Sequence, residues 1–288
     1  MTGKRVLTAL VLIPVVVGIV LYTSTTVVAI ATALVTILAL WEYFALGEAI
    51  GHRAYSHWTS FCALFLLVIQ WGAVSVENRF PIVVVHRVVP FDGGDNTFQA
   101  IFISFVLGIT LLTLWTSRPL VESLPSAGIS ASALLLVAFP LSYAVRLHGV
   151  HNLGHRLLLF ALAITWAGDT VAYFVGRSLG VHPLAPHISP KKTWEGSAGG
   201  ILGSLLVAYA FSFWIKIPLP HLFAMAALGN LAGQMGDLLE SAYKRSAGVK
   251  DSGSLLPGHG GVLDRIDALI LCIPVIWYYL VLVNPATL

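Results

Sequence analysis

Residues 6–45 read VLTALVLIPVVVGIVLYTSTTVVAIATALVTILALWEYFA, which is two apolar runs separated by a short polar break at Tyr22–Thr26. A helix that crosses a hydrocarbon core about 30 Å thick needs about 20 mostly apolar residues. The stretch therefore predicts two spans, over 6–22 and 25–45. Because more apolar runs follow, we expect the first to be a retained anchor and not a cleaved secretory signal.

The same pattern continues along the chain and predicts an all-α polytopic membrane protein. Apolar residues make up 57% of the 288 and charged residues only 10%, against roughly 25% charged in soluble domains. A spanning backbone must satisfy its own hydrogen bonds, which favours helices. Seven further candidate spans run over 58–75, 100–116, 130–146, 157–176, 197–215, 221–241 and 266–283, which with the first two makes about nine.

These spans divide the chain into an N-terminal region, 1–156, with about five spans, and a C-terminal region, 157–288, with about four. The second region carries the loops 177–196 and 242–265. Placing the N-terminus in the cytoplasm puts 11 Lys and Arg inside (Lys4, Arg5, Arg53, Arg118, Arg177, Lys191, Lys192, Lys244, Arg245, Lys250, Arg265) and five outside (Arg79, Arg87, Arg146, Arg156, Lys216). Since cytoplasmic loops carry the basic excess, both of these loops are expected to face the cytoplasm.

Composition also excludes some classes of protein. The net charge is only +3, and no basic tract alternates with aromatics, so nucleic-acid binding is not expected. Cys62 and Cys272 lie far apart within apolar runs, which predicts packing residues and no disulfide or cysteine metal site. The external loop 77–99 contains Asp92, Gly93, Gly94 and Asp95; a solvated turn is favoured over a cation site.

Charged residues gather near the C-terminus, where 237–267 holds nine of them. Asp237 and Glu240 are three residues apart at the end of one predicted span, and Asp264 and Asp267 are three apart at the start of the next, so each pair shares a helix face. Carboxylates near a membrane are costly, and oxygen clusters suit a hard cation such as Mg²⁺. Metal ligation is favoured for Asp237 and Asp264. For Glu240, an ion pair with Lys244 or a supporting role fits the sequence as well as metal ligation does.

Between the two pairs runs SAYKRSAGVKDSGSLLPGHGGVLDRID, residues 241–267. Its five glycines let backbone amides approach an anion, and its lysines and arginines supply countercharge for phosphate oxygens. This composition is typical of a polyphosphate site. Basic residues alone would more often be ordinary cytoplasmic anchors, but here they alternate with two carboxylate pairs.

A second group lies at SPKKTWEGSAGG, residues 189–200, which opens the predicted span 197–215. A helix N-terminus beside Lys191 and Lys192 favours a phosphate or a lipid headgroup. The alternative is a capped helix start whose glycines serve close helix packing. Asp169, within the span 157–176, is a third intramembrane acid that contacts either a metal, a ribose or a basic partner. Glu42, Arg146 and His155 lie at span ends and receive no role.

The residues 241–267 resemble the phosphatidate cytidylyltransferase, or CDP-diacylglycerol synthase, family. The pattern S-x-x-K-R-x4-K-D followed by P-x-H-G-G-x-x-D-R-x-D matches at every fixed position from Ser241 to Asp267. The resemblance extends over Asp169 to Gly200, including S-P-K-K-T-x-E-G, and over Gly236–Ser241, so it covers about the last 120 residues. Before Asp169, only hydrophobic spans are apparent.

The resemblance implies transfer of a cytidylyl group from CTP to phosphatidate in phospholipid biosynthesis, at a cytoplasm-facing site in the cell inner membrane. It implies Mg²⁺ with room for a second cation, a homodimer, and lipid entering laterally. The implied site residues are Lys250, Asp251, His259 and Arg265 for catalysis; Lys191, Lys192, Lys244, Arg245, Glu195 and Asp169 for substrate binding; and Asp237, Asp264 and Asp267 for the metal.

Two other functions fit a charged membrane site. A multi-pass transporter also uses intramembrane acids, but would be expected to place them near the midplane and not at one rim. A CTP-dependent lipid-alcohol kinase would transfer the γ-phosphoryl group and release CDP, whereas the cytidylyltransferase releases pyrophosphate. Analysis of the products separates these alternatives.

Overall fold

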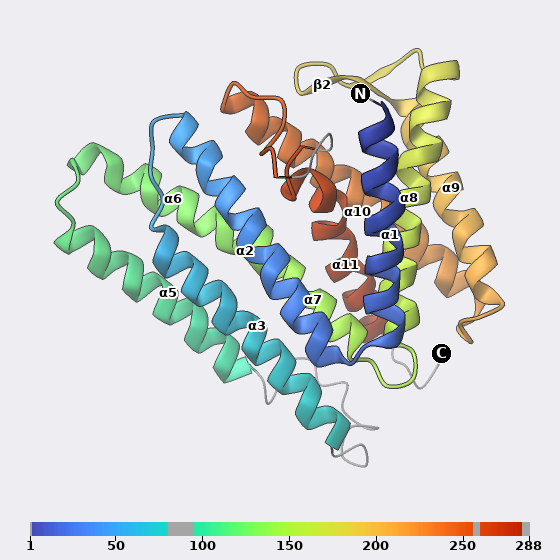
Figure 1. Cartoon of the computed structure of the whole chain (residues 1–288), viewed down its shortest axis with the longest axis horizontal. Helices are drawn as coiled ribbons and strands as arrows, with labels where there is room; N and C mark the ends of the chain where they lie inside the picture. The colour runs from blue at the N-terminus through green and yellow to red at the C-terminus, as the bar shows by residue number, and fades with distance from the viewer. Residues whose placement is uncertain (1, 80–94, 256–259, 284–288) are drawn as a thin grey trace.

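The protein is a bundle of long helices with one small hairpin, as seen in a computed structural model that describes residues 2–79, 95–255 and 260–283 (Figure 1). The helices are α1 (Thr2–Tyr22), α2 (Thr25–Ala49), α3 (Ser56–Arg79), α5 (Asp95–Trp115), η1 (Leu120–Glu122), α6 (Ser123–Ala133), η2 (Leu134–Ala138), α7 (Phe139–His148), α8 (Gly154–Leu179), α9 (Trp194–Ser212), α10 (Leu219–Ser246) and α11 (Leu263–Val283). The strands are β1 (Pro183–Ala185) and β2 (Ser189–Thr193).

Every predicted span falls on a helix, so the helical membrane class is confirmed. Within the described residues, five helical stretches are long and apolar enough to cross a bilayer: Thr25–Ala49, Ser56–Ser75, Leu120–His148, Gly154–Leu179 and Leu263–Val283. The apolar parts of α1 and α5 are shorter, at Leu10–Tyr22 and Gln99–Trp115. The polar break at Tyr22–Thr26 does end one helix and begin the next. Most of the loop 77–99 lies outside the described residues.

The stretch from η1 to α7 is continuous but contains a π-helical segment at η2. Pro140 follows this segment in the first turn of α7. A proline lacks an N–H and its ring clashes with the carbonyl four residues earlier, here that of Leu136. A π segment widens the helix locally, which accommodates that clash without ending the span.

In the part of the chain that the structure describes, the sheet is the antiparallel hairpin β1–β2, in which Pro183 pairs with Thr193 and Ala185 with Ser189. It lies within the loop 177–196. Figure 1 shows it at the same end of the bundle as the start of α1 and the C-terminal end of α10. Hydropathy does not predict so short a sheet, because its strands of three and five residues show no apolar alternation.

Helices α8 and α9 pack closely because glycines line their contact. A Cβ on Gly199 would lie 2.8 Å from the Val175 side chain, and one on Gly203 would lie 2.7 Å from that of Val171. Small residues that allow close backbone approach are typical of helix contacts in membranes. For Gly199, the structure agrees with the alternative interpretation of 189–200, in which the glycines serve helix packing, and Gly203 adds a second such contact.

Two buried clusters hold the bundle together. One joins α1, α2 and α7 to α8–α11 around residues such as Phe160 and Ile276. The other joins α2, α3, α5, α6 and η2 to α11 around Leu40 and Leu134. Cys62 and Cys272 are both buried and unbonded to each other, which confirms their prediction as packing residues.

We expect Gly203→Ala to lower the thermal unfolding temperature of the detergent-purified protein. The new methyl group would overpack the α8–α9 contact, an effect that typically costs about 1–3 kcal/mol. Gly72→Ala in α3 is the control, because a Cβ there meets nothing within 4 Å. Equal unfolding temperatures for the two variants would contradict the proposed role of the contact.

Candidate functional site

Three carboxylates converge where α10 and α11 cross. Asp237, Glu240 and Asp267 each place one oxygen within 4.8 Å of the others. The helices approach closely because Gly236 has no side chain: a Cβ there would lie 2.4 Å from the backbone oxygen of Asp267. The structure thus brings together the predicted ligands Asp237 and Asp267, with Glu240 as the third member. We call these three residues the acidic cluster.

Elements outside this crossing add a fourth acid and a cation. The charge of Asp169, on α8, interacts with those of Asp237, Lys192 and Arg265. Lys192, on β2, places its Nζ 2.5 Å from Asp237 Oδ2, and both side chains are about 70% buried. The hairpin therefore contributes Lys192 to the acidic cluster as an ion-pair partner, and Asp169 belongs to the same electrostatic environment.

Lys244 lies between two carboxylates at the inner side of the cluster. Its Nζ is 2.5 Å from Asp264 Oδ1 and also pairs with Glu240. All three side chains are at most 10% exposed. The pairing predicted as one alternative for Glu240 is confirmed, and Glu240 takes part in the acidic cluster as well. The structure places Lys244 as an internal counter-ion.

Asp264 is held mainly through one of its oxygens. Its Oδ2 accepts from the backbone amides of Ser252 and Gly261, at 2.9 and 2.8 Å, and lies 2.9 Å from the Ser252 hydroxyl. Lys244 contacts the other oxygen, Oδ1, which keeps one of its two lone-pair directions. A cation would therefore reach Asp264 at Oδ1, beside the Lys244 ammonium, and its role as a metal ligand stays a prediction.

The sequence predicts that backbone amides of the loop 242–265 approach a phosphate, but four of these amides donate to protein carboxylates. Ser252 and Gly261 donate to Asp264, while Val262 and Leu263 donate to Glu42 of α2. Sequence reasoning gave Glu42 no role, although a lone acid within an apolar span is itself a signal of function. These four amides are therefore already occupied by protein carboxylates.

Several predicted side chains lie at the exposed rim of the site. Lys250, Asp251, Arg265 and Lys191 are exposed, and the exposed Arg245 donates to the backbone oxygen of Val249 at 2.9 Å. His259 lies outside the described residues. The exposed cations are placed where an anion arriving from solvent would meet them.

The start of α9 is a capped helix terminus. Thr193 Oγ1 accepts from the Gly196 amide at 3.1 Å, as an N-cap does. Glu195 Oε1 is 2.6 Å from His182 Nδ1, and this hydrogen bond lowers the pKa of the Glu195 carboxyl to about 2. Glu195 therefore links the start of α9 to His182, the residue before β1. Its contact with substrate stays a prediction.

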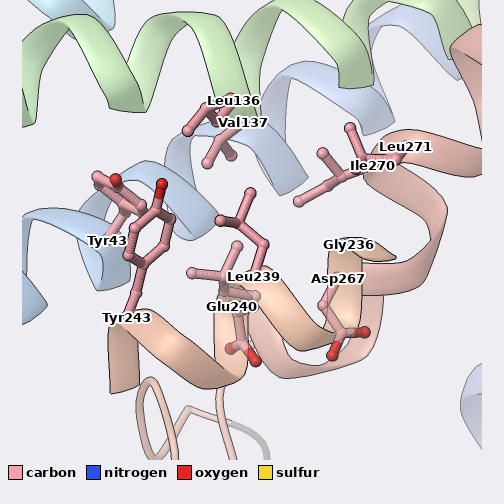
Figure 2. A pocket seen from close by; sticks show the side chains of 11 residues that line it. Tyr43, Leu136, Val137, Gly236, Leu239, Glu240, Tyr243, Asp267, Ile270 and Leu271 are labelled. Carbon is pink, nitrogen blue, oxygen red and sulfur yellow. The ribbon is translucent and has the colours of Figure 1, made fainter. Parts of the chain in front are cut away.

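A small, mainly apolar pocket lies beside the acidic cluster. Figure 2 shows Leu136 and Val137 of the π segment facing Leu239, with the carboxylates of Glu240 and Asp267 at the opposite end. Tyr43 and Tyr243 form one wall, their rings 5.6 Å apart and edge to face. The pocket joins an apolar lining to two carboxylates, and its volume of about 20 Å³ leaves room for about one water molecule.

The fold and the site together define an integral membrane protein of helical type, with a charged site at one end of the bundle. Comparison with known proteins shows which family it is: the chain belongs to the cytidylyltransferase family, whose model matches residues 3–283. This confirms the resemblance and extends it to the N-terminal half.

Individual relatives agree with this assignment. A phosphatidate cytidylyltransferase of Haemophilus influenzae is 32% identical over 97% of this chain and 98% of its own length. One from Bacillus subtilis is 40% identical over 54% of this chain, and one from Staphylococcus epidermidis is 46% identical over 43%. In these last two alignments the chain spans about half the length of the relatives, 58% and 48%.

We expect Lys244→Met to destabilise the protein strongly. Removing one member of a buried ion pair typically costs about 3–5 kcal/mol, because the remaining charges are left without a partner. Thermal unfolding in detergent measures the loss, and Lys191→Met is the matched control at an exposed lysine. Similar unfolding temperatures for both variants would show that Lys244 does not neutralise Glu240 and Asp264.

Proposed function

We propose that the protein transfers the cytidylyl group of CTP to phosphatidate, giving CDP-diacylglycerol and pyrophosphate. The observation that carries the proposal is the relative from Haemophilus influenzae, a phosphatidate cytidylyltransferase aligned over nearly all of both chains. The family match weighs against the transporter and the lipid-alcohol kinase.

The chemistry needs no strong general base. The phosphomonoester of phosphatidate has a second pKa of about 6, so it is mostly dianionic at neutral pH. One of its oxygens attacks the α-phosphorus of CTP; a new O–P bond forms while the bond from the α-phosphorus to the β-phosphate bridge breaks. The protein's task is to align two anions and to stabilise charge on the leaving pyrophosphate.

The acidic cluster fits a divalent cation, because Mg²⁺ prefers hard oxygen ligands and three carboxylates converge there. Asp237 and Asp267 would hold Mg²⁺, with Glu240 or Asp264 as further ligands and a second cation alongside. Bound Mg²⁺ would supply charge neutralisation to the phosphates. Asp169 raises the negative charge of the site and so favours cation binding.

Different basic residues would contact different phosphate groups of the two substrates. Lys191, Lys250 and Arg265 are exposed at the rim and would contact the triphosphate directly, together with Arg245. Lys192 already lies against Asp237, so it would bind a phosphate held beside that carboxylate. Lys244 would keep Glu240 and Asp264 in place. Asp251 and His259 remain assigned to catalysis in this proposal.

The lipid would enter from the side. The pocket in Figure 2 is apolar at η2 and acidic at Glu240 and Asp267; acyl chains would lie toward Leu136 once the pocket widened to admit them, while the headgroup reaches the acidic cluster. We further propose that about nine helices cross the inner membrane, that the site faces the cytoplasm, and that the protein forms a homodimer, as family resemblance implies.

Purified protein in detergent should convert phosphatidate and α-labelled CTP to labelled CDP-diacylglycerol, with release of pyrophosphate, only when Mg²⁺ is present. Asp237→Asn should lower kcat at least about a hundredfold, or about 2.7 kcal/mol, because the substitution removes charge but keeps shape. Glu48→Gln, at an exposed carboxylate, is the control. Release of CDP in place of pyrophosphate would indicate the kinase, and full turnover in excess chelator would exclude the metal.

The orientation predicts which loops can be labelled in sealed vesicles. A cysteine at Ser254, exposed in the loop 242–265, should react with a membrane-impermeant maleimide only from the cytoplasmic side. A cysteine at His151, exposed between α7 and α8, should react only from outside. The native cysteines are buried and supply the background control. Labelling of both sites from one side would mean that the number of crossings between them is even.

A further inference from the structure

Glu42 connects α2 to the loop 242–265 from the other half of the chain. The residue is 4% exposed. Its Oε1 accepts from the Val262 amide at 2.9 Å, and its Oε2 accepts from the Leu263 amide at 2.8 Å. The Ser252 hydroxyl lies 3.2 Å from Oε2 and 2.9 Å from Asp264 Oδ2. Both carboxylate oxygens are therefore committed to this loop.

The loop backbone is shaped to meet this carboxylate. A Cβ on Gly261 would lie 2.4 Å from Glu42 Oε2, and one on Gly253 would lie 2.5 Å from Oε1. Neither distance is compatible with a side chain unless Glu42 or the loop shifts. Two of the glycines thus allow close approach to a fixed protein anion, a role that sequence reasoning assigned to phosphate binding.

The contact also caps a helix. Leu263 is the first residue of α11, and the first amides of a helix have no partner within it. A carboxylate at that position satisfies these donors and interacts favourably with the helix dipole. Here the capping group comes from α2, more than 200 residues earlier in the chain.

What this cap fixes is the position of the charged residues on either side of it. Asp264, Arg265 and Asp267 follow directly in the first turns of α11, and Ser252 follows Lys250 and Asp251. Glu42 and Asp264 hold both ends of the same loop segment, since each contacts Ser252 at one end and the residues 261–263 at the other. A shift of this segment would move the rim cations relative to the acidic cluster.

We propose that Glu42 is a positioning residue that holds the loop 242–265 in register with the acidic cluster and thereby supports CTP binding. The inference rests on the proposed function, in which the loop cations contact the triphosphate. Glu42 does not itself touch substrate. Its loss is expected to weaken binding of CTP and to leave binding of phosphatidate, which approaches through the pocket beside α10, little changed.

The test compares Glu42→Gln, Glu42→Asp and Glu48→Gln. Glutamine keeps the shape but places an NH₂ group against amide donors, so the KM for CTP should rise at least about tenfold, while the KM for phosphatidate changes less than about twofold. Aspartate keeps the charge with a shorter reach and should restore part of the affinity. Glu48 is exposed on the same helix, so its variant should behave as the wild type.

Gly261→Ala provides a second route if Glu42→Gln does not fold. Its methyl group would displace the loop from an unchanged Glu42, and the same selective rise in the KM for CTP is expected. An equal rise in both KM values, or no rise in either variant, would overturn the proposal.

Amide hydrogen exchange provides a readout that does not depend on activity. Exchange at Val262 or Leu263 should be faster in Glu42→Gln than in Glu48→Gln, because one of the two amides then faces an NH₂ group and loses its acceptor. Unchanged exchange would overturn the cap. If the wild type made no CDP-diacylglycerol but exchange still rose, the proposed function would fail while the contact between Glu42 and the loop stood.

Discussion

Mutual repulsion among carboxylates is the constraint on which this site depends. The charge of Asp267 interacts with those of Asp237, Glu240 and Asp169, and the three elements that carry these residues meet at one end of the bundle. Like charges in a medium of low dielectric constant repel strongly. The arrangement is tolerable only where cations lie among the acids, and Lys244 and Lys192 are placed there.

The need for these cations explains much of the surrounding architecture. Lys244 reaches Asp264 as well as Glu240, which links the end of α10 to the first turn of α11. Lys192 reaches Asp237 only because the hairpin folds back over the cluster. Gly236 lets the two helices cross closely enough for the carboxylates to converge. In the proposed reaction, Mg²⁺ and the phosphates of CTP would enter this balanced set of charges.

The helices could be predicted well from the sequence, because the length of an apolar run directly reflects the thickness of a bilayer. The convergence of Asp237 and Asp267 was also predictable, since each belongs to a charged pair at the facing ends of consecutive helices. The hairpin was not, because strands of three and five residues are too short to show a periodic pattern. The acceptor of the loop amides could not be predicted either. Glycine permits close approach to an anion, but it does not indicate whether that anion is a ligand or Glu42.

Direct observation of the bound cation tests the central claim, which is that the acidic cluster binds a divalent metal. Mn²⁺ can replace Mg²⁺ at oxygen sites and scatters X-rays anomalously. Crystals of the protein grown with Mn²⁺ and a non-hydrolysable CTP analogue should show an anomalous peak in contact with the carboxylate of Asp237, between α10 and α11. Bound nucleotide with no peak within coordinating distance of Asp237 or Asp267 would contradict the claim.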